Sequence, residues 1–312
     1  MGKLDLLVAG ELNADVVVGE VDWPVPRHEW LAGSGRIVLG SSAGICASNA
    51  ARLGLRVGLA AVVGRDALGD AMIEAVRAAG VETRWIRRSP KLATGFSVII
   101  NARGVPDKAL LTFPGALADL RGSDVGAALS ETRHLHIASY FLLPRFWGAV
   151  PGLLRRARRL GISSSLDPNP DPLVRYDSGI RAALAEVDIF LPNEVEACGV
   201  AGMRRLEAAI AKLSGGTRAV LVKAGARGAF YCDAHGSMHV PARRLTVVDP
   251  TGAGDSFDAG FIAARLQGWD AARALDFGTR CAALACSAAG GTTAFEAAGA
   301  VAKLRRRMSD ER

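Results

Sequence analysis

The chain has 312 residues, of which 50% are hydrophobic, and a formal net charge of +7. This length and composition predict one α/β domain over residues 1–312 with a full hydrophobic core. No run approaches the roughly 18 apolar residues of a membrane helix, and the N-terminus leads into a strand, so a cytoplasmic protein without a membrane partner is expected. The five cysteines form no C-x-x-C pair, which argues against a disulfide framework or a zinc site.

The positive charge is densest in two arginine clusters, at residues 155–159 and 305–307. Both clusters lie in helical patterns, where such runs usually form solvated faces. Aromatic residues make up 6% of the chain and are not interleaved with the basic ones, so no stacking platform for single strands is evident. Nucleic acid is therefore not a predicted partner, whereas small anionic ligands suit a basic protein.

The first strand pattern, within residues 5–18, breaks at Gly10 and continues with polar residues among apolar ones. Of these, Glu11, Asn13 and Asp15 interrupt the hydrophobic run. Asn13 and Asp15 are two residues apart and share one face of an extended segment, which suits a pair that binds vicinal hydroxyl groups. The alternative is that they are turn residues where the chain changes sheets.

Two later segments predict an excursion from the main sheet. Residues 21–40 are irregular, and residues 94–100 and 108–113 read as strands of a hairpin that turns at residues 101–104. Between these segments, Gly40, Ser41 and Ser42 form a small-residue turn that opens a helix ending at Gly54, and residues 56–64 read as a buried strand.

The central part of the chain alternates strands and helices. Residues 135–140, 162–167, 187–191 and 219–223 are strand-like and are separated by helical segments such as residues 146–160. Repeated β-α units predict a mainly parallel sheet covered on both faces, with ligands at the carboxyl ends of its strands. His134 and His136 share a strand face without an evident third ligand, which favours core histidines over a metal site.

Polar residues follow two of these strands. Asn193 and Glu196 open a helix, where Asn193 caps the helix, approaches a ligand, or does both. Lys223 ends the next strand before a turn that contains Gly225 and Gly228, and it either neutralises a bound anion or is an exposed lysine at a strand end. Residues 271–289 predict a helix of small residues that includes Thr279.

The most specific motif covers residues 249–260, Asp-Pro-Thr-Gly-Ala-Gly-Asp-Ser-Phe-Asp-Ala-Gly. A β-branched run at residues 245–248 predicts a strand before it, and helical spacing follows it. Gly252 and Gly254 allow φ > 0 and close backbone approach, so the helix start predicts an anion site. Asp255 beside an anion site suits a base that deprotonates an attacking hydroxyl. The alternative is an ordinary glycine turn in which Asp255 is a charge in the first helical turn.

Residues 249–260 resemble the C-terminal signature of the PfkB/ribokinase family of carbohydrate kinases, and the resemblance extends over essentially the whole chain. It implies a ribokinase-like three-layer α/β sandwich with a mainly parallel central sheet and a small β lid from about residues 12–40 and 92–115. It also implies residue roles. The catalytic base is Asp255; the anion hole is Gly252, Ala253 and Gly254; the substrate contacts are Asn13, Asp15, Gly40, Ser41, Ser42 and Asp255; the nucleotide contacts are Asn193, Lys223, Gly225, Gly228, Thr251, Gly252, Gly254 and Thr279; and Glu196 binds Mg²⁺ through water.

The resemblance further implies ATP and Mg²⁺ as cofactors, and it is compatible with a monovalent cation and with a homodimer formed through the lid. The expected activity is ATP-dependent phosphorylation of a hydroxymethyl group on a neutral sugar. The alternatives are a nucleoside kinase of the same family, or a catalytically degenerate regulator that binds a sugar or nucleotide.

Several residues depart from the family pattern. Ile45 stands where the N-terminal signature usually has Asn, with Asn49 one helical turn later. Arg65 replaces a carboxylate, and Thr279 replaces an Asn of the adenine pocket. Pro250 in the signature is a mild change, since proline suits a turn.

Substrate class is predicted from residues 167–171, which resemble the family's Asp-x-Asn-x-Arg segment. Asp171 holds the Arg position, where its carboxylate would repel a sugar acid and so favours a neutral acceptor. A nucleoside would also need an apolar wall for its base, for which Trp23, Trp30 and Phe96 are the candidates.

Overall fold

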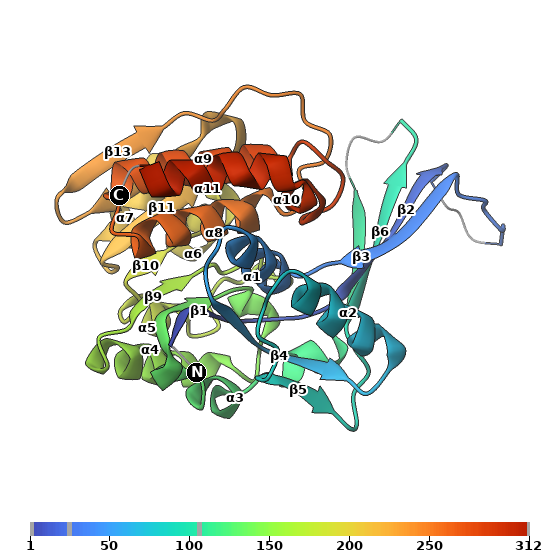
Figure 1. The fold of residues 1–312 in the computed structure, drawn as a ribbon, viewed down its shortest axis with the longest axis horizontal. Coiled ribbons are helices and arrows are strands. Elements are labelled where there is room, and N and C mark those ends of the chain that lie inside the picture. Colours follow the sequence, from blue (N-terminus) through green and yellow to red (C-terminus); the bar gives the residue numbers. More distant parts are fainter. Residues whose placement is uncertain (1–2, 24–26, 105–107, 311–312) are drawn as a thin grey trace.

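The computed structural model describes residues 3–23, 27–104 and 108–310, and within them a nine-stranded sheet forms the centre of the fold (Figure 1). Its order is β13-β12-β11-β10-β9-β8-β1-β4-β5. The strands are β1 (Leu4–Ala9), β4 (Val57–Gly64), β5 (Ile86–Ser89), β8 (Thr132–Ile137), β9 (Ser163–Leu166), β10 (Ile189–Phe190), β11 (Ala219–Lys223), β12 (Ala229–Asp233) and β13 (Gly236–Val240). The pairs from β11 to β5 are parallel, and β12 and β13 add antiparallel strands at one edge.

Helices cover both faces of this sheet, because its strands alternate between two apolar surfaces. On β1, Leu6 and Val8 belong to one core and Leu7 and Ala9 to the other. The first core is closed by α1 (Ser42–Arg52), α2 (Ala67–Ala78), α8 (Ala253–Leu266), α9 (Ala271–Ala285), α10 (Thr293–Glu296) and α11 (Ala298–Asp310). The second is closed by α3 (Gly122–Gly126), α4 (Val150–Arg159), α5 (Ile180–Leu184), α6 (Glu194–Ala201) and α7 (Leu206–Ser214). The predicted three-layer α/β sandwich is confirmed.

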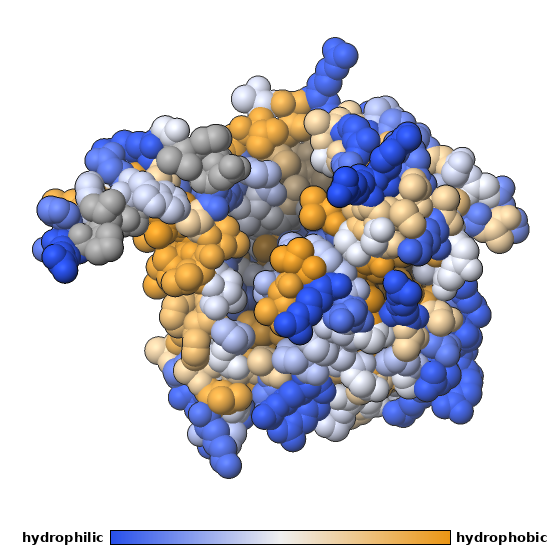
Figure 2. Space-filling model, turned by 180° about the vertical axis from the view of Figure 1, so that it is seen from behind, coloured by the Kyte–Doolittle hydropathy of each residue, from blue (hydrophilic) through white to orange (hydrophobic). Residues whose placement is uncertain are grey.

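A second sheet of four strands projects from one side of this body (Figure 1). Its order is β3 (Ser34–Leu39), β2 (Ala14–Val21), β6 (Phe96–Ala102) and β7 (Ala109–Phe113). This is the predicted lid, although residues 24–26 and 105–107 of its expected ranges lie outside the described residues. Its outer strands expose Ile37, Leu110, Leu111 and Phe113. A homodimer through the lid stays a prediction. The space-filling view shows the hollow between lid and body, bordered by apolar side chains (Figure 2).

The predicted strand at residues 245–248 is wrong. Residues 241–250 contain no strand, and Leu245, Val247 and Val248 are exposed. The amide of Val248 donates to the carbonyl oxygen of Cys286 at 2.9 Å. This β-branched run therefore lies against the C-terminal end of α9 and not along a sheet edge. Its apolar side chains have a different use, since Leu245 and Val247 line a cavity.

The two histidines on β8 and the five cysteines were also assigned roles from the sequence. His134 and His136 are buried, and their ring nitrogens share hydrogen bonds with the hydroxyls of Ser163 and Ser165, which agrees with the core-histidine interpretation. All five cysteines are free. Within the described residues, the helices are too short or too polar to cross a membrane.

Asp66, beside the unusual Arg65, joins three segments of the chain. Its carboxylate caps α2 by accepting from the amide of Gly69 at 2.8 Å, and it accepts from the amide and hydroxyl of Thr94 at 2.8 and 2.6 Å. Although burial opposes the effect, the hydrogen bonds from Thr94 lower the pKa of Asp66. Arg65 itself is exposed, so the departure from the family pattern leaves the carboxylate that caps α2 in place.

Asp66→Ala should therefore lower the free energy of unfolding by about 1–3 kcal/mol at pH 7, because it removes a helix cap and leaves buried donors without partners. Arg65→Ala, the neighbouring control, should stay within about 0.5 kcal/mol of the wild type. Because the folded-state pKa of Asp66 is lowered, its contribution is present above the unfolded-state pKa and is lost as the pH falls through the folded value. Urea unfolding of both variants over a pH series measures this, and equal stability of the two at pH 7 would contradict it.

Candidate functional site

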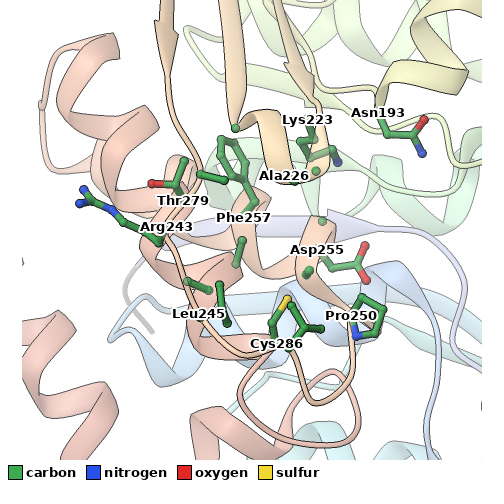
Figure 3. Close-up of a pocket in the computed structure, with 18 of the residues that line it drawn as sticks. Asn193, Lys223, Ala226, Arg243, Leu245, Pro250, Asp255, Phe257, Thr279 and Cys286 are labelled. Atoms are coloured by element: carbon green, nitrogen blue, oxygen red, sulfur yellow. The ribbon is translucent and has the colours of Figure 1, made fainter.

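A cavity of about 780 Å³ lies at the carboxyl ends of the parallel strands. One end carries polar side chains, among them Asn193, Lys223 and Asp255, and the other end carries Leu245, Thr279 and Arg243 (Figure 3). Such a cavity, with an apolar wall and a few converging polar groups, has the size and character of a small-molecule site. Of the predicted site residues, it brings together Ser42, Asn193, Glu196, Lys223, Gly225, Gly228, Ala253, Gly254, Asp255 and Thr279.

The glycine turn places the start of α8 against this cavity. Gly252 is the N-cap residue with φ 74°, and a Cβ there would come within 2.5 Å of the Cα of Gly291. A side chain is excluded on both counts. The first residues of α8, Ala253 and Gly254, line the cavity, so the free amides of the helix start border it. The predicted anion hole thus has the required backbone geometry.

Asp255, in the first turn of α8, lines the same cavity. Burial raises the pKa of its carboxyl to about 7, and the neighbouring charge of Asp167 adds to the increase, while Lys223 opposes it. A carboxylate with a pKa near the operating pH is well matched to the work of a general base. Ser42, from the start of α1, interacts with Asp255 through its side chain and lowers the pKa.

Lys223 connects the sheet to α8. Its ammonium donates to Oδ2 of Asp167 at 2.7 Å and to Oδ2 of Asp258 at 2.9 Å. Burial works against the charged form, yet Asp167 and Asp258 raise the pKa of Lys223 above its ordinary value. The interpretation of Lys223 as a merely exposed lysine is wrong, since its side chain is 11% exposed. Its Nζ also lies 3.7 Å from where a Cβ of Gly254 would stand, which places the cation beside the start of α8.

Asn193 and Glu196 form a reciprocal capping box at the start of α6. Oε2 of Glu196 accepts from the amide of Asn193 at 2.8 Å, and Oδ1 of Asn193 accepts from the amide of Glu196 at 2.9 Å. Burial raises the pKa of Glu196 to about 8, and Asp167 contributes to the increase. Both residues also line the cavity. Capping of the helix and an orientation toward a ligand are therefore compatible. A divalent cation fits this end, because it would stabilise carboxylates that burial and mutual repulsion disfavour. Among the described residues, no cluster of three or more His, Cys, Asp or Glu forms a direct metal cage.

Asn13 and Asp15 form a second group with Gly40, outside the lining of this cavity. A Cβ at Gly40 would lie 2.4 Å from Oδ1 of Asp15 and 3.0 Å from Nδ2 of Asn13, so the turn approaches both side chains closely. Burial raises the pKa of Asp15 to about 6. Ser41 caps α1 by accepting from the amide of Gly44 at 2.8 Å. Only Ser42 of this turn lines the 780 Å³ cavity.

Thr251 directly precedes the glycine turn and does not line the cavity. Its hydroxyl and amide donate to Oδ1 of Asp249 at 2.7 and 3.0 Å. Lys108, from the lid, donates to the same carboxylate at 3.1 Å and to the hydroxyl of Thr251 at 2.9 Å. The pair therefore ties the lid to the signature, and a direct contact of Thr251 with nucleotide stays a prediction.

The departures at Ile45 and Thr279 have clear structural consequences. Ile45 packs against Gly252 and Gly291, and the amide group of Asn49 is buried, where it donates to Ser256 at 2.9 Å and to the carbonyl oxygen of Gly291 at 3.0 Å. Asn49 thus connects α1 to α8 and to the turn at Gly291. Thr279 lines the cavity, but its hydroxyl donates to the carbonyl oxygen of Asp276 at 2.7 Å.

The predicted orientation of Asp171 toward a ligand is wrong. Its carboxylate is buried in its own loop, where it accepts from the amides of Leu173, Arg175 and Tyr176 at 2.9, 2.9 and 2.7 Å. It does not line the cavity, so it cannot repel a ligand there. The resemblance to the family motif identifies the position of Asp171 in the chain. The direction of its side chain depends instead on the loop that follows, at residues 172–176.

Residues that the sequence did not single out as site residues also line or border the cavity. Asp167 and Asn169 follow β9 and line it, and Asp258 lies behind it as a partner of Lys223. Two features of the sequence could have indicated them: Asp167 stands at the end of a strand, and Asp258 stands about one helical turn after Asp255. Trp23, Trp30 and Phe96 do not line the cavity, and both tryptophans are exposed.

A model of the pfkB family of carbohydrate kinases matches residues 24–298 of this chain. The chain is 27% identical to a ribokinase of Haemophilus influenzae over 91% of this chain and 93% of that protein. It is 30% identical to an ATP-dependent ribose-1-phosphate kinase of Halopiger xanaduensis, covering 93% and 94%. A structure described as a ribokinase II of E. coli in complex with ATP and Mg²⁺ superposes with a TM-score of 0.83 at 27% identity, covering 97% and 99%.

The ion group around Lys223 predicts a strong effect on stability. Lys223→Met should lower the free energy of unfolding by about 3–5 kcal/mol, because the carboxylates of Asp167 and Asp258 would stay buried without their cation. Lys91→Met, a change at an exposed lysine, is the matched control. Thermal and urea unfolding measure the difference, and a Lys223→Met protein as stable as the control would overturn the assignment.

Proposed function

The chain belongs to the pfkB family of carbohydrate kinases and is an ATP-dependent carbohydrate kinase, and we propose that it phosphorylates a hydroxymethyl group of a neutral sugar. The observation that supports this most directly is the position of Asp255. Its carboxylate follows the glycine turn at the start of α8 and lines the cavity that the anion site borders.

In the proposed mechanism, Asp255 takes the proton of the acceptor hydroxyl as that oxygen attacks the γ-phosphorus of ATP. The bond from phosphorus to the bridging oxygen of ADP breaks, and the amides of Gly252, Ala253 and Gly254 stabilise the charge on the transferred phosphoryl oxygens. Lys223 adds positive charge beside them. When bound, Mg²⁺ neutralises charge on the phosphates, and Glu196 with Asn193 would hold it through water.

The cavity and the neighbouring group of Asn13 and Asp15 suit the two substrates. Leu245, Val247 and Cys286 form part of an apolar wall for the adenine of ATP, with Thr279 at its edge. On the other side, Asn13 and Asp15 would bind hydroxyl groups of the acceptor. The lid would then exclude water from the phosphate, as phosphotransfer requires.

A neutral acceptor is supported by charge, although not through Asp171. The acceptor side presents the carboxylates of Asp15, Asp167 and Asp255, while the ammonium of Lys223 is already paired with Asp167 and Asp258. A sugar acid would therefore meet like charges without a free cation from Lys223. A neutral polyol instead finds hydrogen-bond acceptors.

The deciding experiment is a phosphotransfer screen with MgATP over ribose, deoxyribose, fructose, adenosine, cytidine and 2-keto-3-deoxygluconate. We expect a neutral sugar to have the highest kcat/KM. Asp255→Asn should lower kcat by about 10²–10⁴-fold while acceptor affinity stays within a few-fold, because only proton removal is lost. Glu207→Gln, an exposed carboxylate changed in the same way, is the control. Preferred turnover of a nucleoside or of the sugar acid would refute the neutral-sugar proposal, and binding without turnover would indicate a regulator.

The pKa of Asp255 predicts how activity depends on pH. A general base works in its deprotonated form, and the pKa of this carboxyl is raised to about 7. Consequently kcat/KM for MgATP should rise with pH through an apparent pKa near 7, and should fall about tenfold per pH unit on the acid side. Initial rates from acidic to mildly alkaline pH measure the profile. A profile with no acid limb in this range would exclude Asp255 as the rate-determining base.

A further inference from the structure

Glu11 is a buried carboxylate that the proposed mechanism does not use. It follows β1 by two residues and is 2% exposed. Its Oε1 accepts from the amide of Ser42 at 2.6 Å, at the start of α1. Its Oε2 is buried and has no hydrogen-bond partner among the described residues. A carboxylate held in this way costs free energy, so its presence calls for a function.

The backbone around Glu11 is also under constraint. Ser41, Ser139 and Asn169 have φ values of 71°, 57° and 58°, in the left-handed region that residues other than glycine seldom adopt. The hydroxyl of Ser139 interacts with Glu11 and also accepts from Nδ2 of Asn169 at 3.0 Å. Three strand or helix ends thus adopt an unfavourable conformation around one carboxylate, which is a feature typical of functional sites.

Two connections lead from Glu11 to the cavity. The first passes through Ser42, whose amide binds Glu11 while its side chain interacts with Asp255. The second passes through Ser139 to Asn169, which lines the cavity beside Asp167. We propose that Glu11 is a positioning residue of the phosphotransfer site, which orients Asp255 through Ser42 and Asn169 through Ser139. This inference rests on the proposed function only in taking Asp255 as the base.

Burial raises the pKa of Glu11, while the hydrogen bonds from Ser139 and from the Ser42 amide favour its charged form. In that form Glu11 gives this role a readout that a purely structural residue would lack. Besides burial, Asp167 and Glu11 raise the pKa of Asp255, whereas Lys223 and the Ser42 side chain lower it. The titratable groups that face Asp255 are Glu11 after β1, Cys46 in α1, Asp167 after β9, Glu196 in α6 and Lys223 at the end of β11, with Asp258 one turn further along α8. Removing the charge of Glu11 should therefore lower the pKa of Asp255, whereas removing the hydroxyl of Ser42 should raise it.

The test uses the full chain labelled with ¹³C at the aspartate side-chain carboxyls, and follows the Asp255 signal by NMR as the pH changes. The signal is assigned by its absence from Asp255→Asn. Glu11→Gln keeps an acceptor for the Ser42 amide and should lower the titration midpoint by about one pH unit, the size of effect that a nearby charge produces. Ser42→Ala should raise the midpoint. Glu11→Asp, which keeps the charge, should restore a midpoint near that of the wild type, and Glu207→Gln should leave it unchanged.

An unchanged midpoint in Glu11→Gln, or shifts of the two variants in the same direction, would overturn the proposal. If Glu11→Gln does not fold, Ser42→Ala and Glu11→Asp decide: a Ser42→Ala midpoint that is not raised contradicts the connection to Asp255. The acid limb of kcat/KM should move with the NMR midpoint in each variant. The titration itself requires no acceptor, so failure of every acceptor in the screen would refute the proposed function while the midpoint still decides the role of Glu11.

Discussion

The ammonium of Lys223 holds the two structural parts of the site in place. Asp167 follows a strand of the sheet and Asp258 belongs to α8, and both carboxylates accept a hydrogen bond from this one ammonium group. Buried carboxylates at this separation would otherwise repel each other and would favour water over the protein interior. The pairing therefore fixes α8 against the sheet, and the glycine turn at its start is positioned as a consequence.

The carboxylates left over from this pairing determine the electrostatics of the cavity. Burial, together with the nearby charge of Asp167, raises the pKa values of Asp255 and Glu196 to about 7 and about 8. Among the described residues neither carboxylate forms a salt bridge of its own. The same surplus of negative charge that prepares a base also disfavours a bound phosphate. Helix amides, Lys223 and a divalent cation would offset this repulsion in different ways, so the proposed anion site and the proposed base are compatible as neighbours.

The lid is connected to this arrangement through several charged residues. Asp15 belongs to the strand β2 of the lid, and Lys108 reaches from the lid to Asp249 at the beginning of the signature. Arg36, on another lid strand, approaches the same carboxylate at 3.7 Å. The carboxylate of Asp249 also accepts from the amide of Gly290 at 3.0 Å. One residue thus connects the lid, the beginning of the signature and the turn after α9.

The sequence by itself determined the features that depend on contiguous residues. Alternating strands and helices predicted the mainly parallel sheet, and the turn at residues 252–254 predicted the helix start, because backbone conformation and helix polarity are local properties. The role of Asp255 as a base stays a prediction. The tertiary structure decided which side chains meet. It turned Asp171 into its own loop, gave Lys223 two carboxylates from distant elements, left residues 245–248 without a strand partner, and buried Glu11 against Ser42. Those outcomes depend on neighbours far away in the chain, whose positions only the packing of the whole sheet and its helices specifies.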